Sequence, residues 1–196
     1  MNLSRPIRAV IPSLHGDVLS VLARADQPMT GRAVARLVGD AGSTAGVARV
    51  LKMLVQEGLV RCTSLGPASL YELNRAHLAA DAIVALSRLR EALVDRLRRA
   101  VAEVGPPLTR AILFGSLARG GGDASSDVDV LLVHGPLDAA TEQRWDDALA
   151  RLGSDIRSWS GNPPGIVVYA ESELTDALTA GDEFVRDVLE HGVRLL

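Results

Sequence analysis

A glycine-rich stretch and two closely spaced aspartates lie between two short apolar runs, and this arrangement constrains the fold more than any other part of the sequence. The order is apolar run, Gly-Ser, ten residues, Asp-x-Asp, apolar run, and the parts are 111–114, Gly115-Ser116, Asp127-Val128-Asp129 and 130–133. Both apolar runs have the length of buried strands. Because alternate residues of a strand face the same side, a strand that opens at Asp127 presents both carboxylates together.

These residue types suit the binding of a metal and a nucleotide. Paired carboxylates provide the oxygen ligands that Mg²⁺ prefers, and they leave positions for phosphate oxygens. Gly115 lets the backbone approach a phosphate, the Ser116 hydroxyl can donate to it, and Arg119 can add a charge-assisted contact. Asp127 and Asp129 are therefore the candidate metal ligands and catalytic residues. The expected ligands are Mg²⁺ and a nucleoside triphosphate, with ATP as the expected nucleotide.

The same residues carry a family resemblance. The segments 114–120 and 126–133 resemble the DNA polymerase β-like nucleotidyltransferase superfamily. They are most similar to its minimal nucleotidyltransferases, a group that includes antitoxins that modify their partner toxins. The resemblance covers residues 110–135, and a compatible strand and helix pattern continues to residue 196. It implies an α/β domain with a small mixed sheet over residues 106–196, and Mg²⁺-dependent transfer of a nucleotidyl group to a protein or small-molecule hydroxyl.

One departure from the family pattern concerns a third carboxylate. Active members usually carry it on the third strand, which we expect at residues 165–170, after a turn at 161–164. The corresponding place here is apolar, near Val167 or Val168. Glu171 at the end of the strand and Asp155 in the preceding helix are the alternative candidates. Without a third carboxylate, the attacking hydroxyl lacks a base and a second metal site is incomplete.

The charge distribution divides the chain into parts with different expected partners. Residues 1–76 carry a net charge of +4, residues 77–105 carry +1 and residues 106–196 carry −8. A basic first part followed by an acidic last part indicates two modules. Phosphates of nucleic acid are the partners that favour the basic module.

The basic module has the pattern of a winged helix-turn-helix domain, which we assign to residues 1–76. Apolar residues at helical spacing predict three helices, capped by Ser13, by Thr30 and by Ser43 or Thr44. Strands over 59–64 and 69–73 follow. Residues 10–75 resemble winged-helix transcriptional repressors, in which the third helix would contact double-stranded DNA. The expected contact residues are Ser43, Thr44, Arg49, Lys52 and, in the wing, Arg61. The alternative is a winged helix used for protein contacts or dimerisation.

A single long helix is predicted between the modules, over residues 77–105. No Pro or Gly occurs from His77 to Val104, and apolar residues recur there at spacings of three and four. Gly105-Pro106-Pro107 ends the helix. Such a helix either packs on its own chain or pairs with its copy in a homodimer, and the sequence leaves both open.

The sequence thus predicts an α+β protein: an N-terminal winged helix-turn-helix, a linking helix and a polymerase β-like nucleotidyltransferase domain. No apolar run reaches the length of a membrane span, the N-terminus lacks the apolar core of a signal peptide, and one cysteine excludes a disulfide framework. We expect a cytoplasmic protein with no membrane partner. Three functions remain open: a nucleotidyltransferase enzyme, a transcriptional regulator whose degenerate domain senses a nucleotide, and the antitoxin of a toxin partner.

Overall fold

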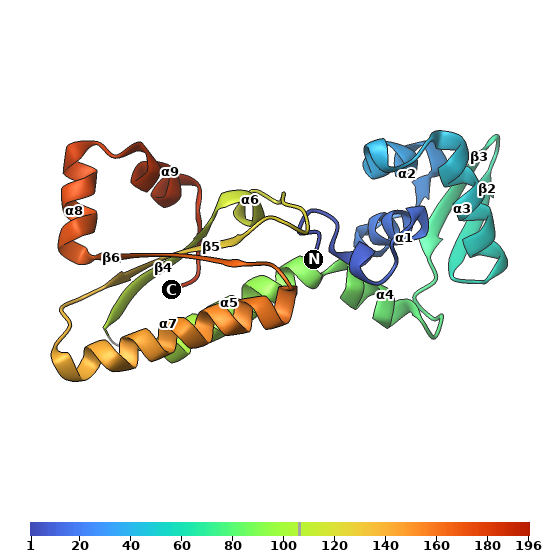
Figure 1. Cartoon of the computed structure of the whole chain (residues 1–196). Helices are drawn as coiled ribbons and strands as arrows, with labels where there is room; N and C mark the ends of the chain where they lie inside the picture. The colour runs from blue at the N-terminus through green and yellow to red at the C-terminus, as the bar shows by residue number, and fades with distance from the viewer. Residues whose placement is uncertain (106) are drawn as a thin grey trace. The chain divides into compact units, whose positions relative to one another are not determined.

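The computed structural model describes residues 1–105 and 107–196, which form two compact units (Figure 1). We call residues 5–90 the N-terminal unit, and residues 1–4 together with 91–196 the C-terminal unit. The chain therefore passes between the units twice, at Ser4–Arg5 and at Arg90–Glu91. Pro106, the predicted first residue of the last domain, lies outside the described residues.

The N-terminal unit consists of helices and a small antiparallel sheet. Its elements in chain order are η1 (Pro6–Ala9), α1 (Leu14–Arg24), β1 (Met29–Thr30), α2 (Gly31–Val38), η2 (Gly39–Ala41), α3 (Thr44–Gln56), β2 (Val60–Leu65), β3 (Ala68–Leu73) and α4 (Ala80–Ser87). The strand order is β1-β3-β2. All three expected helices and both expected strands of this region are present, but β1 was not predicted, because two residues are too short to give a periodic pattern.

Local capping explains where the predicted helices begin and end. The Thr30 hydroxyl accepts a hydrogen bond from the Ala33 amide at the start of α2, at 3.2 Å. The Ser43 hydroxyl accepts one from Gly46 at the start of α3, at 3.1 Å. Gly58 follows α3 with a φ of 73°, the left-handed conformation that ends many helices. These bonds confirm the caps expected at Thr30 and Ser43.

One core surrounds α1 and takes residues from every helix of the N-terminal unit. Val18, Val34, Val47 and Leu51 are fully buried in it. Leu37 of α2 lies outside this core, and its side chain is 58% exposed. The helix is short, and Val34 and Val38 already fill the face that α1 and α3 cover.

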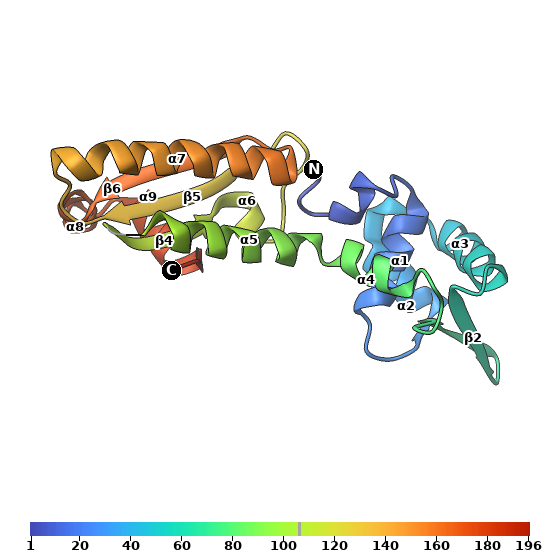
Figure 2. The same ribbon diagram turned by 90° about the horizontal axis from the view of Figure 1, so that it is seen from below.

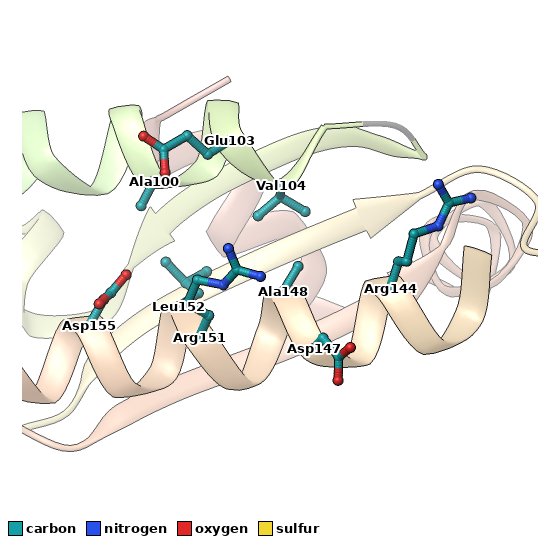
Figure 3. Close-up of a pocket in the computed structure, with 9 residues that line it drawn as sticks. All are labelled: Ala100, Glu103, Val104, Arg144, Asp147, Ala148, Arg151, Leu152 and Asp155. Carbon is teal, nitrogen blue, oxygen red and sulfur yellow. The ribbon is translucent and has the colours of Figure 1, made fainter. Parts of the chain in front are cut away.

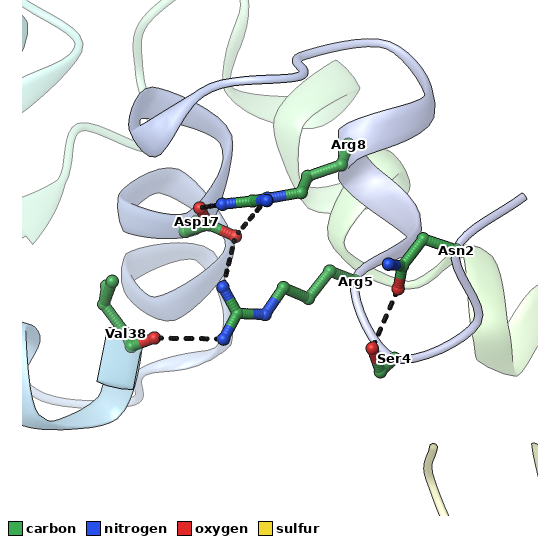
Figure 4. A network of polar contacts seen from close by, with 6 residues as sticks. All are labelled: Asn2, Ser4, Arg5, Arg8, Asp17 and Val38. Atoms are coloured by element: carbon green, nitrogen blue, oxygen red, sulfur yellow. Dashed lines mark hydrogen bonds and ion pairs between the residues drawn. The ribbon is translucent and has the colours of Figure 1, made fainter. Parts of the chain in front are cut away.

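A buried carboxylate joins the first turn of the N-terminal unit to α1. Asp17 is 6% exposed, and Arg8 donates to both of its oxygens, with the shortest bond 2.6 Å from Nη2 to Oδ2 (Figure 4). Arg5 lies 3.7 Å from the same carboxylate and donates to the carbonyl oxygen of Val38 at 3.4 Å. Asp17 thus ties η1 and α2 to the middle of the unit.

We expect Asp17→Asn to lower the free energy of unfolding by about 2 kcal/mol, because the change removes the charge of the buried carboxylate to which Arg8 donates and against which Arg5 lies. Thermal unfolding of the full chain measures the effect. Asp26→Asn is the control, because Asp26 is an exposed aspartate of the same unit. Equal melting temperatures for the two variants would show that the ion pair contributes no stability.

The predicted linking helix is wrong as a single element. The structure has two helices there, α4 and then α5 (Leu89–Val104), separated at Arg88, whose φ of −109° and ψ of 18° leave the helical region. The buried Ser87 hydroxyl donates to the Val84 carbonyl oxygen at 2.7 Å, a bond that competes with helical pairing. The two helices pack into different cores, with Ile83 in that of the N-terminal unit and Leu97 in that of the C-terminal unit.

The C-terminal unit is a four-stranded mixed sheet with helices. After α5, its elements are β4 (Leu108–Phe114), α6 (Gly115–Ala118), β5 (Val128–His134), α7 (Ala139–Ser160), β6 (Pro164–Ala170), α8 (Glu171–Ala180), α9 (Glu183–His191) and β7 (Val193–Arg194). The strand order is β6-β5-β4-β7. β5 runs parallel to β6 and antiparallel to β4, so the sheet is mixed, as predicted.

Helices cover the two faces of this sheet in pairs (Figures 1 and 2). Helices α5 and α7 pack on one face through a core that includes Leu97, Ile156 and, from β5, Val130. On the other face, Leu131 of β5 packs with Val185 of α9 and with residues of α8. Because strand residues alternate in direction, Asp129 projects to the α8–α9 face, like Leu131.

Within residues 1–105 and 107–196, no helix combines the length and the apolar character that crossing a membrane requires.

Candidate nucleotide and metal site

The candidate site lies at one edge of the sheet, where three strands meet. β4 ends at Phe114 and continues into Gly115, while β5 and β6 both begin at this edge. In the register, Asp129 is paired with Phe114 on one side and with Gly165 on the other. Sheet pairing therefore brings the Gly-Ser turn and the second aspartate together, although they are far apart in the sequence.

Two glycines enclose the carboxylate of Asp129. A Cβ at Gly115 would overlap Asp129 Oδ2, and a Cβ at Gly165 would lie 2.5 Å from Asp129 Oδ1. Gly115 also has a φ of 69°, which disfavours any residue with a side chain. Each carboxylate oxygen thus lies against the backbone of a glycine. Gly115 was predicted from the motif, whereas Gly165 was not.

Burial and a neighbouring charge raise the pKa of Asp129. Loss of hydration is the larger cause, repulsion by Asp127 adds to it, and the positive charge of Arg119 opposes both. An acid whose pKa is raised in the folded chain favours folding when protonated, and this contribution is lost as the pH rises through its folded pKa. A bound cation would remove that cost. The donor set of two adjacent carboxylates therefore fits a divalent ion such as Mg²⁺.

The remaining predicted site residues lie on or next to α6. Ser116 is half-buried within this helix, and its carbonyl oxygen accepts a hydrogen bond from the Gly121 amide at 2.8 Å. Arg119 follows the helix and is exposed, with Nη1 3.9 Å from an oxygen of Asp187 on α9. Asp187 also lies 3.1 Å from the Nδ1 atom of His191. Helix α9 thus brings further polar side chains to Arg119.

Asp123 supports the loop before the aspartate pair. Its Oδ1 accepts hydrogen bonds from the amides and hydroxyls of Ser125 and Ser126, at 2.7 to 3.1 Å. These bonds, first that from the Ser125 hydroxyl, lower the pKa of Asp123. The carboxylate is engaged within its own loop.

The register corrects the expected place of the third carboxylate. The residue of β6 opposite Asp129 is Gly165, whereas Val167 is paired with Leu131 and packs in the apolar core under α8 and α9. Val168 contributes to the core on the other face. Glu171 follows the far end of β6, about 20 Å along the strand from Gly165 at 3.3 Å per residue.

Asp155 is excluded by its position on the opposite face of the sheet. With Arg144, Asp147 and Arg151 of α7 and Glu103 of α5, it lines a pocket of about 240 Å³ between these two helices (Figure 3). That pocket is separated from Asp129 by the sheet itself. Among the described residues, no group of three or more His, Cys, Asp or Glu side chains is placed to hold a metal ion.

The residues expected to contact DNA are all exposed, at the cap of α3, on α3 itself and on β2. They are Ser43, Thr44, Arg49, Lys52 and Arg61. The Ser43 hydroxyl oxygen accepts the capping bond from the Gly46 amide, and its own proton can still be donated to a phosphate oxygen. The inward face of the helix consists of Val47, Val50, Leu51 and Leu54.

Comparison with known protein families identifies the C-terminal unit. The model of the nucleotidyltransferase domain family matches residues 94–195, which is more than half of the chain. The chain belongs to this family. The match includes both aspartates, the Gly-Ser turn, and all three strands that meet at the site. The matched range therefore coincides with the C-terminal unit, apart from residues 1–4, 91–93 and 196.

Comparisons with individual proteins add nothing further to the nucleotidyltransferase assignment. No curated protein matches the chain. A solved structure of human N-acetylserotonin methyltransferase in complex with SAM is matched with 21% identity and a TM-score of 0.30. The match covers 52% of this chain and 31% of the methyltransferase chain. Likeness at that level supports no statement about fold or activity.

Proposed function

We propose that the nucleotidyltransferase domain binds Mg²⁺ and a nucleoside triphosphate, and transfers the nucleotidyl group to a hydroxyl of a protein or small molecule. The observation that carries this proposal is the meeting of two carboxylates with the Gly-Ser turn at one sheet edge. Asp127 and Asp129 would hold the ion, and Gly115, Ser116 and Arg119 would bind the phosphates. ATP is the nucleotide we propose to test first.

Each group has a distinct part in this reaction. Bound Mg²⁺ would supply the positive charge that polarises the α-phosphate. The Ser116 hydroxyl and the Arg119 guanidinium orient phosphate oxygens by hydrogen bonds. The acceptor oxygen forms a bond to the α-phosphorus while the bond to pyrophosphate breaks. With glycine at position 165, no carboxylate opposite Asp129 takes the acceptor proton, so the proton passes to water and transfer is slow.

The direct test is incubation of the full chain with Mg²⁺ and labelled nucleoside triphosphates, alone and with cell lysate. Label transfer together with pyrophosphate release supports the enzyme, provided that both are lost when Asp127 and Asp129 are replaced. The absence of any Mg²⁺-dependent nucleotide binding by the wild-type chain would contradict the whole assignment.

A second candidate is a regulator that binds the nucleotide without transferring it. Gly165 favours this function, because the position opposite Asp129 offers no general base, which typically contributes 10²–10⁴-fold to a rate. Binding of Mg²⁺ and nucleotide without pyrophosphate release would favour the regulator. An antitoxin would combine nucleotidyl transfer to a partner protein with regulation of transcription. Label transfer to a single small protein in the lysate would favour that function.

We further propose that the N-terminal unit is a winged helix that binds double-stranded DNA. Three helices, a hairpin and an antiparallel sheet in the order observed are the parts that such a domain requires. Exposed Arg49 and Lys52 lie one turn apart on α3, and the net charge of +4 over residues 1–76 attracts phosphates.

Replacing Arg49 and Lys52 with Ala should weaken duplex binding and reduce its dependence on salt. The slope of log K against log salt should fall by about one unit for each phosphate that the variant no longer neutralises. Arg151→Ala with Arg157→Ala is the matched control, since it removes the same charge from exposed positions of α7. A wild-type chain that binds no duplex at low salt would refute the DNA-binding proposal.

A further inference from the structure

The two aspartates of the candidate site are held in different ways. Asp129 lies within β5, and its backbone is fixed by pairing with Phe114 and Gly165 on both sides. Asp127 lies one residue before the strand and is exposed. Its position depends on its neighbours Ser126 and Val128. The Val128 amide is fixed by a hydrogen bond to the Pro163 carbonyl oxygen at 2.9 Å.

The other neighbour of Asp127 is fixed by a buried side chain. The Nδ2 atom of Asn162 donates to the carbonyl oxygens of Ser126, at 2.9 Å, and of Asp123, at 3.2 Å. Asn162 is itself fully buried, and its Oδ1 accepts a hydrogen bond from the α-ammonium of Met1 at 2.8 Å. A buried amide whose donors and acceptor are all engaged has one orientation available to it.

The N-terminal residues hold the preceding part of the same loop. Leu3 is fully buried in the core of the nucleotidyltransferase domain, and the Ser4 amide donates to the Gly122 carbonyl oxygen at 2.9 Å. A Cβ at Gly122 would lie 3.1 Å from Leu3 and 2.8 Å from the Ser116 hydroxyl oxygen. Residues 122–126 are therefore bounded by Leu3 and Ser4 at one end and by Asn162 at the other.

We propose that Asn162 is a positioning residue for Asp127. Residues 1–4 support the same loop at its other end by fixing Gly122. The inference rests on the proposed function, since it assigns Asn162 to the proposed metal site. Asn162 acts through the backbone. By holding the carbonyl oxygen of Ser126, it restricts the backbone conformation, and hence the side-chain direction, of Asp127. Asp127 is then presented beside Asp129 before any ligand binds, which lowers the entropic cost of binding the ion.

The decisive variant is Asn162→Asp, which keeps an oxygen for the α-ammonium of Met1 but removes the two bonds to the loop. In the ligand-free full chain, we expect amide hydrogen exchange over residues 120–128 to accelerate at least about tenfold. In the presence of Mg²⁺, we expect the Kd for ATP to rise about tenfold, which corresponds to the loss of one to two hydrogen bonds. Higher Mg²⁺ concentrations should restore part of the affinity.

Two controls separate positioning from a general loss of stability. Leu152→Ala creates a cavity in the buried core of the same domain and removes none of the hydrogen bonds to the loop. Asn74→Asp removes a similar amide-to-carbonyl bond, to Gly58, in the N-terminal unit. Both should leave the exchange of 120–128 and the Kd as in the wild type. If Asn162→Asp changes exchange there no more than Leu152→Ala does, the positioning role is refuted, whatever the wild-type chain binds. If instead the wild type binds no nucleotide, the proposed function fails. The exchange data still decide whether Asn162 holds residues 120–128 in place.

Discussion

Replacing both Asp127 and Asp129 with Asn is expected to weaken Mg²⁺-dependent nucleotide binding by at least about 100-fold. Two unit charges at about 4 Å interact by about 4 kcal/mol near a protein surface, and 1.4 kcal/mol corresponds to a tenfold change in affinity. Loss of two carboxylates beside a divalent ion therefore exceeds two orders of magnitude. Calorimetric titration of the full chain with ATP at fixed Mg²⁺ measures the change.

The stability of the same variants provides an internal check. Asp129→Asn removes a partly buried charge that Asp127 repels, so the ligand-free chain should melt at a slightly higher temperature than the wild type. The gain should vanish at low pH, where the wild-type carboxyl is protonated. Unchanged nucleotide affinity in the double variant would show that the metal site lies elsewhere. A lower melting temperature of the double variant would mean that it loses binding because its fold is disturbed.

Gly115→Ala, which adds a single methyl group, should strongly weaken nucleotide binding. Its Cβ would overlap Asp129 Oδ2, so the carboxylate must move. The positive φ of 69° adds about 1–2 kcal/mol of backbone strain. We expect the loss of affinity to approach that of the double aspartate variant, with a melting temperature lowered by several degrees.

The control for this substitution is Gly105→Ala. Gly105 has a similar φ of 66°, and a Cβ there would come no closer than 4.0 Å to the Glu103 carbonyl oxygen. The control therefore carries the strain without the overlap, and it should lose stability while keeping nucleotide affinity. Equal affinities for Gly115→Ala and Gly105→Ala would mean that the Asp129 carboxylate takes no part in binding.

The sequence predicted which residues come together at one end of the sheet where its signal is local. Gly115, Ser116, Asp127 and Asp129 stand next to apolar runs that have the length of buried strands, and the sheet brings them to one edge. Gly165 could not be assigned to the site in the same way. Its relation to Asp129 depends on the register between β5 and β6, and a register is fixed by packing of whole strands rather than by the residues of one turn.

The linking helix shows a different kind of failure. Neither Pro nor Gly interrupts residues 77–104, and the apolar spacing is continuous across the break at Arg88. The break instead accompanies the division into two cores, of which one buries Ile83 and the other buries Leu97, and the Ser87 hydroxyl bond lies at that point. Periodicity identifies a buried face but does not say which core buries it.

Because the chain passes between the units twice, proteolysis cannot separate them cleanly. A single proteolytic cut cannot release both units whole, because a cut at Arg90–Glu91 leaves residues 1–4 on the N-terminal fragment. A fragment that starts at Glu91 contains all of the segment that the family model matches, yet its core lacks Leu3. Removing a buried leucine side chain typically costs about 2–5 kcal/mol. The C-terminal unit is thus discontinuous in sequence, because residues 1–4 and residues 91–196 belong to one compact unit on either side of the N-terminal unit in the chain.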